Sequence, residues 1–274
     1  MPPKLGIVAG GGALPAILVQ HCRRSGREFA VAAIADHCDP KAVEGAAQRR
    51  FRLGRLGGMI RYFREAGVGE VVIAGGVSRP SLLEMRPDFR ALRFYLGARG
   101  WRLGDGRLLN ALIGLLEQQE GFAVVGAEAV MPDLLARAGP LGKAVPGAAA
   151  LQDIALGRRD ALALGASDRG QGVVVRDGAV IGREDREGTD ALLRRCAQAG
   201  GRGGVLVKIA KPLQDRRVDL PAIGPGTVKA AAEAGLKGIA VESGGALILD
   251  RAAVAEAADR VGLFVVALAP ERPA

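Results

Sequence analysis

The chain has 274 residues, 49% of them hydrophobic and 24% charged, and its formal net charge is +9. This length exceeds one typical core and predicts two domains, and the composition is that of a folded protein. The three cysteines form no CxxC pair, which argues against a disulfide framework and against a cysteine-type zinc site. Arginines are scattered and aromatic residues are few, so we expect small anionic partners rather than nucleic acid.

The first half of the chain alternates short apolar runs with helical segments. This alternation predicts βα units and a parallel sheet. We expect strands at residues 4–9, 29–34, 70–74 and 122–125, and helices at residues 10–24, 61–66 and 108–119.

The middle of the chain changes in composition. Residues 131–150 are rich in Pro and Gly and hold few long apolar runs, which is typical of a linker. We therefore place the first domain at residues 1–132, the linker at residues 133–149 and the second domain at residues 150–274.

The second half has a different pattern of apolar and helical segments, which predicts a mixed α/β domain. Residues 171–181 read as a hairpin whose two-residue turn is Asp177-Gly178. We expect further strands at residues 205–209, 239–241, 246–249 and 263–267, and helices at residues 152–164, 189–199, 225–234 and 251–260.

A glycine loop, Gly10-Gly11-Gly12, joins the first strand to the first helix. Such a loop at a helix N-terminus can present backbone N–H groups to a phosphate. We therefore assign Gly11, Gly12, Ala13 and Leu14 to substrate binding. The alternative interpretation is a tight strand-to-helix turn without a ligand.

The same loop raises a second candidate function. Asp36 follows the second strand, roughly where a dinucleotide-binding fold places the acid that binds ribose. Pro15, however, stands where the pattern G-x-G-x-x-G has its third glycine. The alternative function is therefore an NAD(P)-dependent oxidoreductase with a degenerate glycine loop.

Two other segments of the first half are candidate substrate-binding positions. Gly76, Ser78 and Arg79 follow an apolar strand, at the sheet edge where ligands of parallel α/β proteins bind. Asp105 precedes a helix and is either its N-terminal cap or a ligand that faces the site. For both segments an ordinary loop or cap remains the alternative.

In the second half, Thr189 and Asp190 lie at the start of a predicted helix, just after Glu187. Acids and a hydroxyl at a helix start form a capping arrangement. The same oxygen atoms also suit Mg²⁺ beside a substrate phosphate. The sequence alone leaves both interpretations open.

The segment from Lys208 to Thr227 has the richest chemistry, because it combines cations, acids, Pro and Gly after an apolar strand. Cations neutralise a diphosphate, and a carboxylate holds Mg²⁺ or orients the attacking water. Asp219 is bracketed by apolar residues and a proline, which would fix its position; a solvated charged loop is the alternative. The residues of this segment that we predict to be catalytic are Lys208, Lys211, Asp215, Arg217 and Asp219.

These segments resemble the LpxI-type UDP-2,3-diacylglucosamine pyrophosphatases of lipid A synthesis. The resemblance covers nearly the whole chain and implies an N-terminal Rossmann-like domain and a C-terminal catalytic α/β domain. It rests on LGIVAGGGALP (residues 5–15), AGGVSRP (74–80), DRGQGVVVRDG (168–178), EGTDALLRR (187–195) and KIAKPLQDRRVDLPAIGPGT (208–227).

The resemblance implies hydrolysis of UDP-2,3-diacylglucosamine to UMP and 2,3-diacylglucosamine 1-phosphate, which is called lipid X. Water attacks the uridine-side phosphorus with the help of Mg²⁺ or Mn²⁺. The acid of the family's VDLP stretch is important for catalysis and matches Asp219. We assign Asp219 and Asp190 as metal ligands, and the further substrate-binding residues are Gln171, Thr189, Asp190, Gln214 and Thr227.

The sequence departs from the family pattern at Gly106 and in the stretch before Glu187, so we assign no role to Glu184. The resemblance also implies a homodimer with peripheral contact to the inner face of the inner membrane. We expect a cytoplasmic protein, because no signal peptide is visible and no uncharged run approaches the ~20 residues of a spanning helix.

Overall fold

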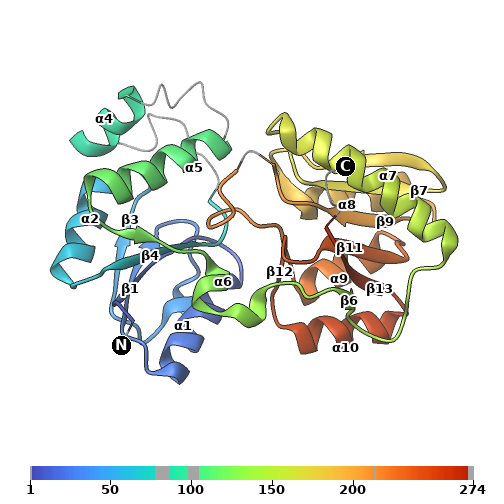
Figure 1. The fold of residues 1–274 in the computed structure, drawn as a ribbon, viewed down its shortest axis with the longest axis horizontal. Coiled ribbons are helices and arrows are strands. Elements are labelled where there is room, and N and C mark those ends of the chain that lie inside the picture. The colour runs from blue at the N-terminus through green and yellow to red at the C-terminus, as the bar shows by residue number, and fades with distance from the viewer. Residues whose placement is uncertain (1, 78–86, 98–104, 213, 271–274) are drawn as a thin grey trace. The chain divides into compact units, whose positions relative to one another are not determined.

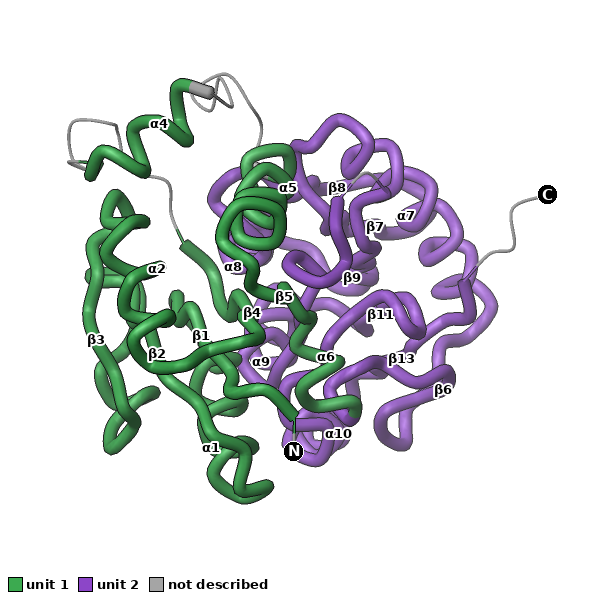
Figure 2. The backbone as a smooth tube through the Cα atoms, turned by 60° about the vertical axis from the view of Figure 1, so that its left-hand side comes forward, with its two compact units in different colours: residues 1–132 green, residues 133–274 purple. Residues whose placement is uncertain are grey.

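The computed structural model describes residues 2–77, 87–97, 105–212 and 214–270 (Figure 1). The chain divides into two compact units, Met1–Pro132 and Asp133–Ala274, which Figure 2 colours separately. Ser78 and Arg79, two of the predicted substrate-binding residues, lie outside the described residues.

Unit 1 is built on a five-stranded sheet with the order β3-β2-β1-β4-β5. All of its strand pairs are parallel, which confirms the predicted parallel sheet. The central strand is buried along its whole length, as expected for a strand covered on both faces. The strands are β1 Leu5–Ala9, β2 Phe29–Ile34, β3 Gln48–Phe51, β4 Glu70–Ala74 and β5 Ala123–Val124.

The elements of unit 1 differ from the prediction at several places: η1, α4 and α6 were not expected, and β3 and α2 also differ. β3 was not expected, because only Phe51 of its four residues is buried and the pattern QRRF resembles a charged loop. α2 begins at Leu56 rather than at 61, because a distant carboxylate, that of Asp88, accepts hydrogen bonds from the N–H groups of Gly57 and Gly58. The described helices are α1 Leu14–Ser25, η1 Pro40–Val43, α2 Leu56–Glu65, α4 Phe89–Gly97, α5 Asp105–Gly114, η2 Leu115–Gln119 and α6 Ala127–Val130.

Unit 2 contains a six-stranded mixed sheet with the order β6-β13-β11-β9-β7-β8, which confirms the predicted mixed α/β class. β9, β11 and β13 run parallel, while β7 and β8 form the predicted hairpin. Its turn residues Asp177 and Gly178 both have positive φ angles, as this tight turn requires. The strands are β6 Gly139–Pro140, β7 Gly172–Arg176, β8 Ala179–Arg183, β9 Val205–Lys208, β11 Gly238–Glu242 and β13 Phe264–Leu268; β10 Ala222–Ile223 and β12 Leu247–Ile248 form a separate pair.

Helices cover both faces of the unit 2 sheet. Along β9, Val205 and Val207 pack in one apolar cluster with α7, while Leu206 packs in a second cluster with the other helices. This alternation places the end of β9 between two packed layers and fixes the start of the segment that follows Lys208. The helices are α7 Ala148–Ala166, α8 Gly188–Ala199, α9 Pro225–Glu233 and α10 Arg251–Val261, with the short helix η3 Pro132–Leu134 before them.

Residues 133–149, whose composition predicts a linker, are grouped with unit 2. Gly139 and Pro140 pair with β13, and the N–H of Leu141 donates to the carbonyl of Val265 at 2.8 Å. Leu141 is buried in the core of this unit. Pro and Gly therefore shape an edge strand here, a role that composition cannot separate from that of a linker.

The glycine loops after β1 and β4 are joined backbone to backbone. The N–H of Gly11 donates to the carbonyl of Gly76 at 2.8 Å, and the N–H of Gly76 donates to the carbonyl of Gly11 at 3.1 Å. A β-carbon on Gly10 would lie 2.6 Å from the Gly76 carbonyl oxygen, and one on Gly75 would lie 2.2 Å from that of Gly11. The glycine triplet is therefore explained in large part by the close approach of two strand ends.

Gly75 and Gly76 provide a matched test of this contact. Gly75 has a φ of 87° and a crowded β-carbon position, whereas a β-carbon on Gly76 would meet nothing within 4 Å. We expect Gly75→Ala to lower the free energy of unfolding by at least about 2 kcal/mol, and Gly76→Ala to change it by less than about 0.5 kcal/mol. Urea unfolding followed by circular dichroism measures both, and equal losses would contradict the account.

Candidate active site

The buried ammonium of Lys208, the first residue of the predicted catalytic segment, contacts the backbone of Ala222 near the end of that segment. Lys208 is the last residue of β9 and is only 5% exposed. Its Nζ donates a hydrogen bond to the carbonyl of Ala222, in β10, at 3.2 Å. A buried charge requires polar partners, so this contact constrains the intervening residues, Asp219 among them.

Asp219 lies beside a second lysine of the same segment. Its Oδ2 is 3.6 Å from Nζ of Lys211, which in turn lies 3.1 Å from Oδ1 of Asp168. The side chain of Asp219 is 30% exposed, while that of Lys211 is 13% exposed. The Asp219 carboxylate is therefore held near a cation by a long contact and still reaches solvent.

The pKa values indicate one interacting group of charges around these residues. Burial lowers the pKa of Lys208, and the negative charges of Glu184, Asp219 and Asp190 act against this effect. Burial raises the pKa of Asp219, although the positive charges of Lys211 and Lys208 oppose it. For Lys211, burial is outweighed by the carboxylates of Asp219 and Asp168, which raise its pKa. The structure thus brings together Lys208, Lys211 and Asp219, and the charge of Asp190 acts on Lys208.

Glu184 is a further member of this group that the sequence analysis left without a role. Its carboxylate is buried and accepts hydrogen bonds from the Thr189 hydroxyl at 2.9 Å and from the Gln171 backbone N–H at 3.1 Å. A β-carbon on Gly172 would lie 2.7 Å from Glu184 Oε2, so glycine is needed there. The signal in the sequence is the pair of glycines around Gln171, which leaves space for the side chain of Glu184, directly after β8.

Asp215 and Arg217, both predicted to be catalytic, pair with each other. Arg217 donates from Nη2 to Asp215 Oδ2 at 2.7 Å and from Nε to Oδ1 at 3.0 Å. These hydrogen bonds lower the pKa of the Asp215 carboxyl. The two opposite charges therefore compensate each other locally, and the structure gives Asp219 rather than Asp215 the contact with Lys211.

Two more predicted residues flank this segment. The side-chain oxygen of Gln214, Oε1, is buried without a hydrogen-bond partner among the described residues. The Thr227 hydroxyl oxygen accepts from the N–H of Gly224 at 3.2 Å and thereby caps α9. The structure thus assigns Thr227 a capping contact, and leaves Gln214 with an acceptor that a ligand hydroxyl could satisfy.

In unit 1, the predicted residues divide into two groups. Gly11 and Gly76 hydrogen-bond to each other, whereas Gly12, Ala13 and Leu14 lead into α1, whose N-cap residue Ala13 supplies no side-chain cap. The first N–H groups of α1 therefore remain suited to an anion. Asp105 begins α5, and its side chain lies outside the described residues.

The two layered units and the lysine–carboxylate cluster define a class: a two-domain α/β protein with a site suited to a phosphate-bearing ligand. The chain belongs to the LpxI family. The family model described as the LpxI N-terminal domain matches residues 4–134, and the one described as the LpxI C-terminal domain matches residues 137–266.

Similar proteins include the UDP-2,3-diacylglucosamine pyrophosphatase LpxI of Caulobacter vibrioides, which is 42% identical over 280 residues, covering 98% of this chain and 99% of that protein. Among solved structures, a UDP-glucose 4-epimerase of Thermus thermophilus with NAD is 18% identical, covers 98% of this chain and 86% of its own, and has a TM-score of 0.34. The biotin carboxylase domain of a Hydrogenobacter thermophilus 2-oxoglutarate carboxylase is 13% identical over 73% of this chain and 41% of its own, with a TM-score of 0.27. Both TM-scores are too low to carry an argument.

Among the described residues, no helix combines the length and the apolar character that crossing a membrane requires.

The opposite pKa shifts of Asp219 and Asp215 predict opposite effects of charge removal on stability. The raised pKa of Asp219 means that stability is lost as pH rises from 3.8 through the folded-state pKa. Asp219→Asn should therefore raise the Tm at pH 7, and this gain should disappear as pH falls towards 3.8. The lowered pKa of Asp215 has the reverse sign, so Asp215→Asn should lower the Tm at pH 7.

Thermal unfolding of both variants between about pH 3.5 and pH 8, in steps of about half a unit, measures this difference. A loss of Tm at pH 7 in Asp219→Asn as large as that in Asp215→Asn would contradict the charge assignment.

Proposed function

We propose that this protein hydrolyses UDP-2,3-diacylglucosamine to UMP and 2,3-diacylglucosamine 1-phosphate. The observation that carries the proposal is the carboxylate of Asp219, held 3.6 Å from Lys211 within the charge cluster around Lys208. Membership of the LpxI family and the 42% identity to a protein named for this reaction support it.

The lysines supply the first part of the mechanism. A diphosphate carries several negative charges, and ammonium groups fixed at its oxygens stabilise the additional charge that develops during attack. Lys211 is partly exposed and held by an ion pair, so it needs little rearrangement to face a phosphate. The buried Lys208 would act on the phosphates through its positive charge. We assign them to the phosphates, and the Arg217–Asp215 pair to holding the shape of the segment.

Asp219 supplies the second part. Burial raises the pKa of the Asp219 carboxyl, and a raised pKa makes a carboxylate a better proton acceptor. We assign it to orient the attacking water and to take its proton. The water oxygen bonds to the uridine-side phosphorus, the bond from that phosphorus to the bridging oxygen breaks, and the bridging oxygen leaves with the sugar 1-phosphate.

Mg²⁺ or Mn²⁺ fits the donor set of this cluster. The described residues contain no group of three or more His, Cys, Asp or Glu arranged to hold a metal by themselves. Mg²⁺ is commonly held by one or two carboxylates together with substrate phosphates, and Asp219 and Asp190 supply such oxygen ligands beside Lys208. Bound there, the ion would neutralise charge on the diphosphate.

The other predicted positions are assigned to substrate recognition. The N-terminal turn of α1, reached through Gly12, Ala13 and Leu14, is suited to an anionic part of the nucleotide. Gln171 and Thr189 border Glu184, and Gln214 offers a buried acceptor for a hydroxyl group. We further propose that the protein is a cytoplasmic homodimer that contacts the inner membrane peripherally.

Asp219→Asn tests the proposed reaction. Removing a positioned general base typically costs about 10²- to 10⁴-fold in rate, so kcat for UMP release should fall by about that factor. Glu256→Gln on α10 is the matched control, because it also converts an acid to an amide but lies on an exposed ion pair with Arg260. Release of UMP, followed by chromatography with Mg²⁺ present, gives the rates.

Unchanged turnover by Asp219→Asn would remove Asp219 from the mechanism. No UMP release by the unsubstituted protein, with either Mg²⁺ or Mn²⁺, would contradict the proposed function itself.

A further inference from the structure

α4 exposes apolar side chains where a surface helix normally carries polar ones. Phe89, Leu92 and Leu96 are 80%, 41% and 54% exposed, while Ala91 and Tyr95 are buried. The spacing of the three exposed residues is i, i+3 and i+7, so they form one stripe along the helix. An exposed apolar stripe of this kind indicates a contact surface.

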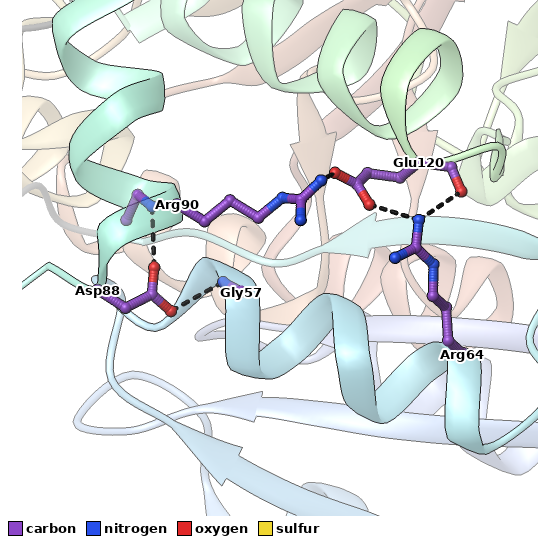
Figure 3. Close-up of polar contacts among 6 residues, drawn as sticks. Gly57, Arg64, Asp88, Arg90 and Glu120 are labelled. Atoms are coloured by element: carbon purple, nitrogen blue, oxygen red, sulfur yellow. Dashed lines mark hydrogen bonds and ion pairs between the residues drawn. The ribbon is translucent and has the colours of Figure 1, made fainter.

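Polar contacts at its N-terminal end fix α4 in place. The carboxylate of Asp88 accepts from the N–H of Gly57 at 2.8 Å and from the N–H of Ala91 at 2.8 Å, so one side chain caps both α2 and α4 (Figure 3). Arg90 also forms an ion pair with Glu120, whose side chain is fully buried and lies 2.7 Å from Arg64 as well. The stripe therefore belongs to an anchored helix.

The surroundings of α4 are basic. Arg93 on the helix is exposed, and the N–H of Asp88 donates to the carbonyl of Gly54 at 2.9 Å, which places the exposed Arg52 and Arg55 in the adjoining segment. Residues 45–64 contain no acid at all; their charged residues are Arg49, Arg50, Arg52, Arg55, Arg61 and Arg64.

The nearby acids offset only part of this charge at the surface, where Glu65 forms an ion pair with Arg49 at 3.7 Å. Asp88 is engaged as a double cap, and Glu120 is buried between two arginines. A second copy of the chain would bring the same cations against themselves, which costs free energy. An anionic lipid surface, in contrast, matches both the apolar stripe and the arginines.

We propose that α4 is a membrane-docking helix. Phe89, Leu92 and Leu96 enter the apolar region beneath the headgroups, and the neighbouring arginines bind anionic headgroup phosphates. This inference rests on the peripheral membrane contact proposed above and names the surface that makes it. It uses no residue of the Lys208–Asp219 cluster, so its failure would leave the proposed reaction intact.

The test is flotation of the full chain with phosphatidylcholine vesicles that contain or lack phosphatidylglycerol. We expect binding to the anionic vesicles that weakens with added salt, and little binding to the neutral ones. The double variant Phe89→Ser/Leu92→Ser should reduce binding by at least about tenfold. Its matched control is Val145→Ser/Val261→Ser, which removes two other exposed apolar side chains, 66% and 51% exposed.

Since all four residues are exposed, both variants should fold, which circular dichroism and an unchanged Tm verify. Anionic-vesicle binding that survives in the α4 variant, or falls equally in the control, would overturn the proposal. A change of oligomeric state in the α4 variant with vesicle binding intact would identify a second copy as the occupant instead. A raised KM for detergent-dispersed substrate with vesicle binding intact would identify acyl chains as the occupant.

Discussion

The burial of one ammonium group, that of Lys208, organises the second unit of this protein. β9 carries it between two layers of helices, where water cannot reach it, so nearby groups must balance its charge. The carbonyl of Ala222 and the carboxylates around it do so. Asp219 lies between Lys208 and Ala222 in the sequence. The hydrogen bond between these two residues therefore satisfies a buried charge and also constrains the position of the carboxylate proposed for catalysis.

Burial also affects the Asp219 carboxyl, because it raises the pKa of this group despite two neighbouring lysines. A carboxyl whose pKa is raised by burial is typical of functional sites, where proteins retain such groups. Glu184 differs from Asp219. Its carboxylate accepts two hydrogen bonds, and the glycines on either side of Gln171 leave room for it. From this fixed position its negative charge acts on Lys208.

The sequence predicted the α/β class of both halves, because hydrophobic periodicity carries that information. It also placed Lys208, Lys211 and Asp219 in one contiguous segment. It missed contacts between distant positions. Asp88 allows α2 to begin before Gly57, and Glu184 fills the space left beside Gly172. The sequence also favoured a phosphate loop at Gly10-Gly11-Gly12. Much of the need for glycine there comes from the close approach of Gly75 and Gly76, which only the parallel sheet brings near.

In the proposed reaction, water oriented at Asp219 attacks the uridine-side phosphorus of a diphosphate. The most direct measurement is incubation with UDP-2,3-diacylglucosamine and Mg²⁺ in ¹⁸O-labelled water, followed by mass spectrometry of both products. Attack at the uridine-side phosphorus places the label in UMP and not in the sugar 1-phosphate. Label in the sugar 1-phosphate would contradict the direction of attack, and the absence of both products would contradict the reaction.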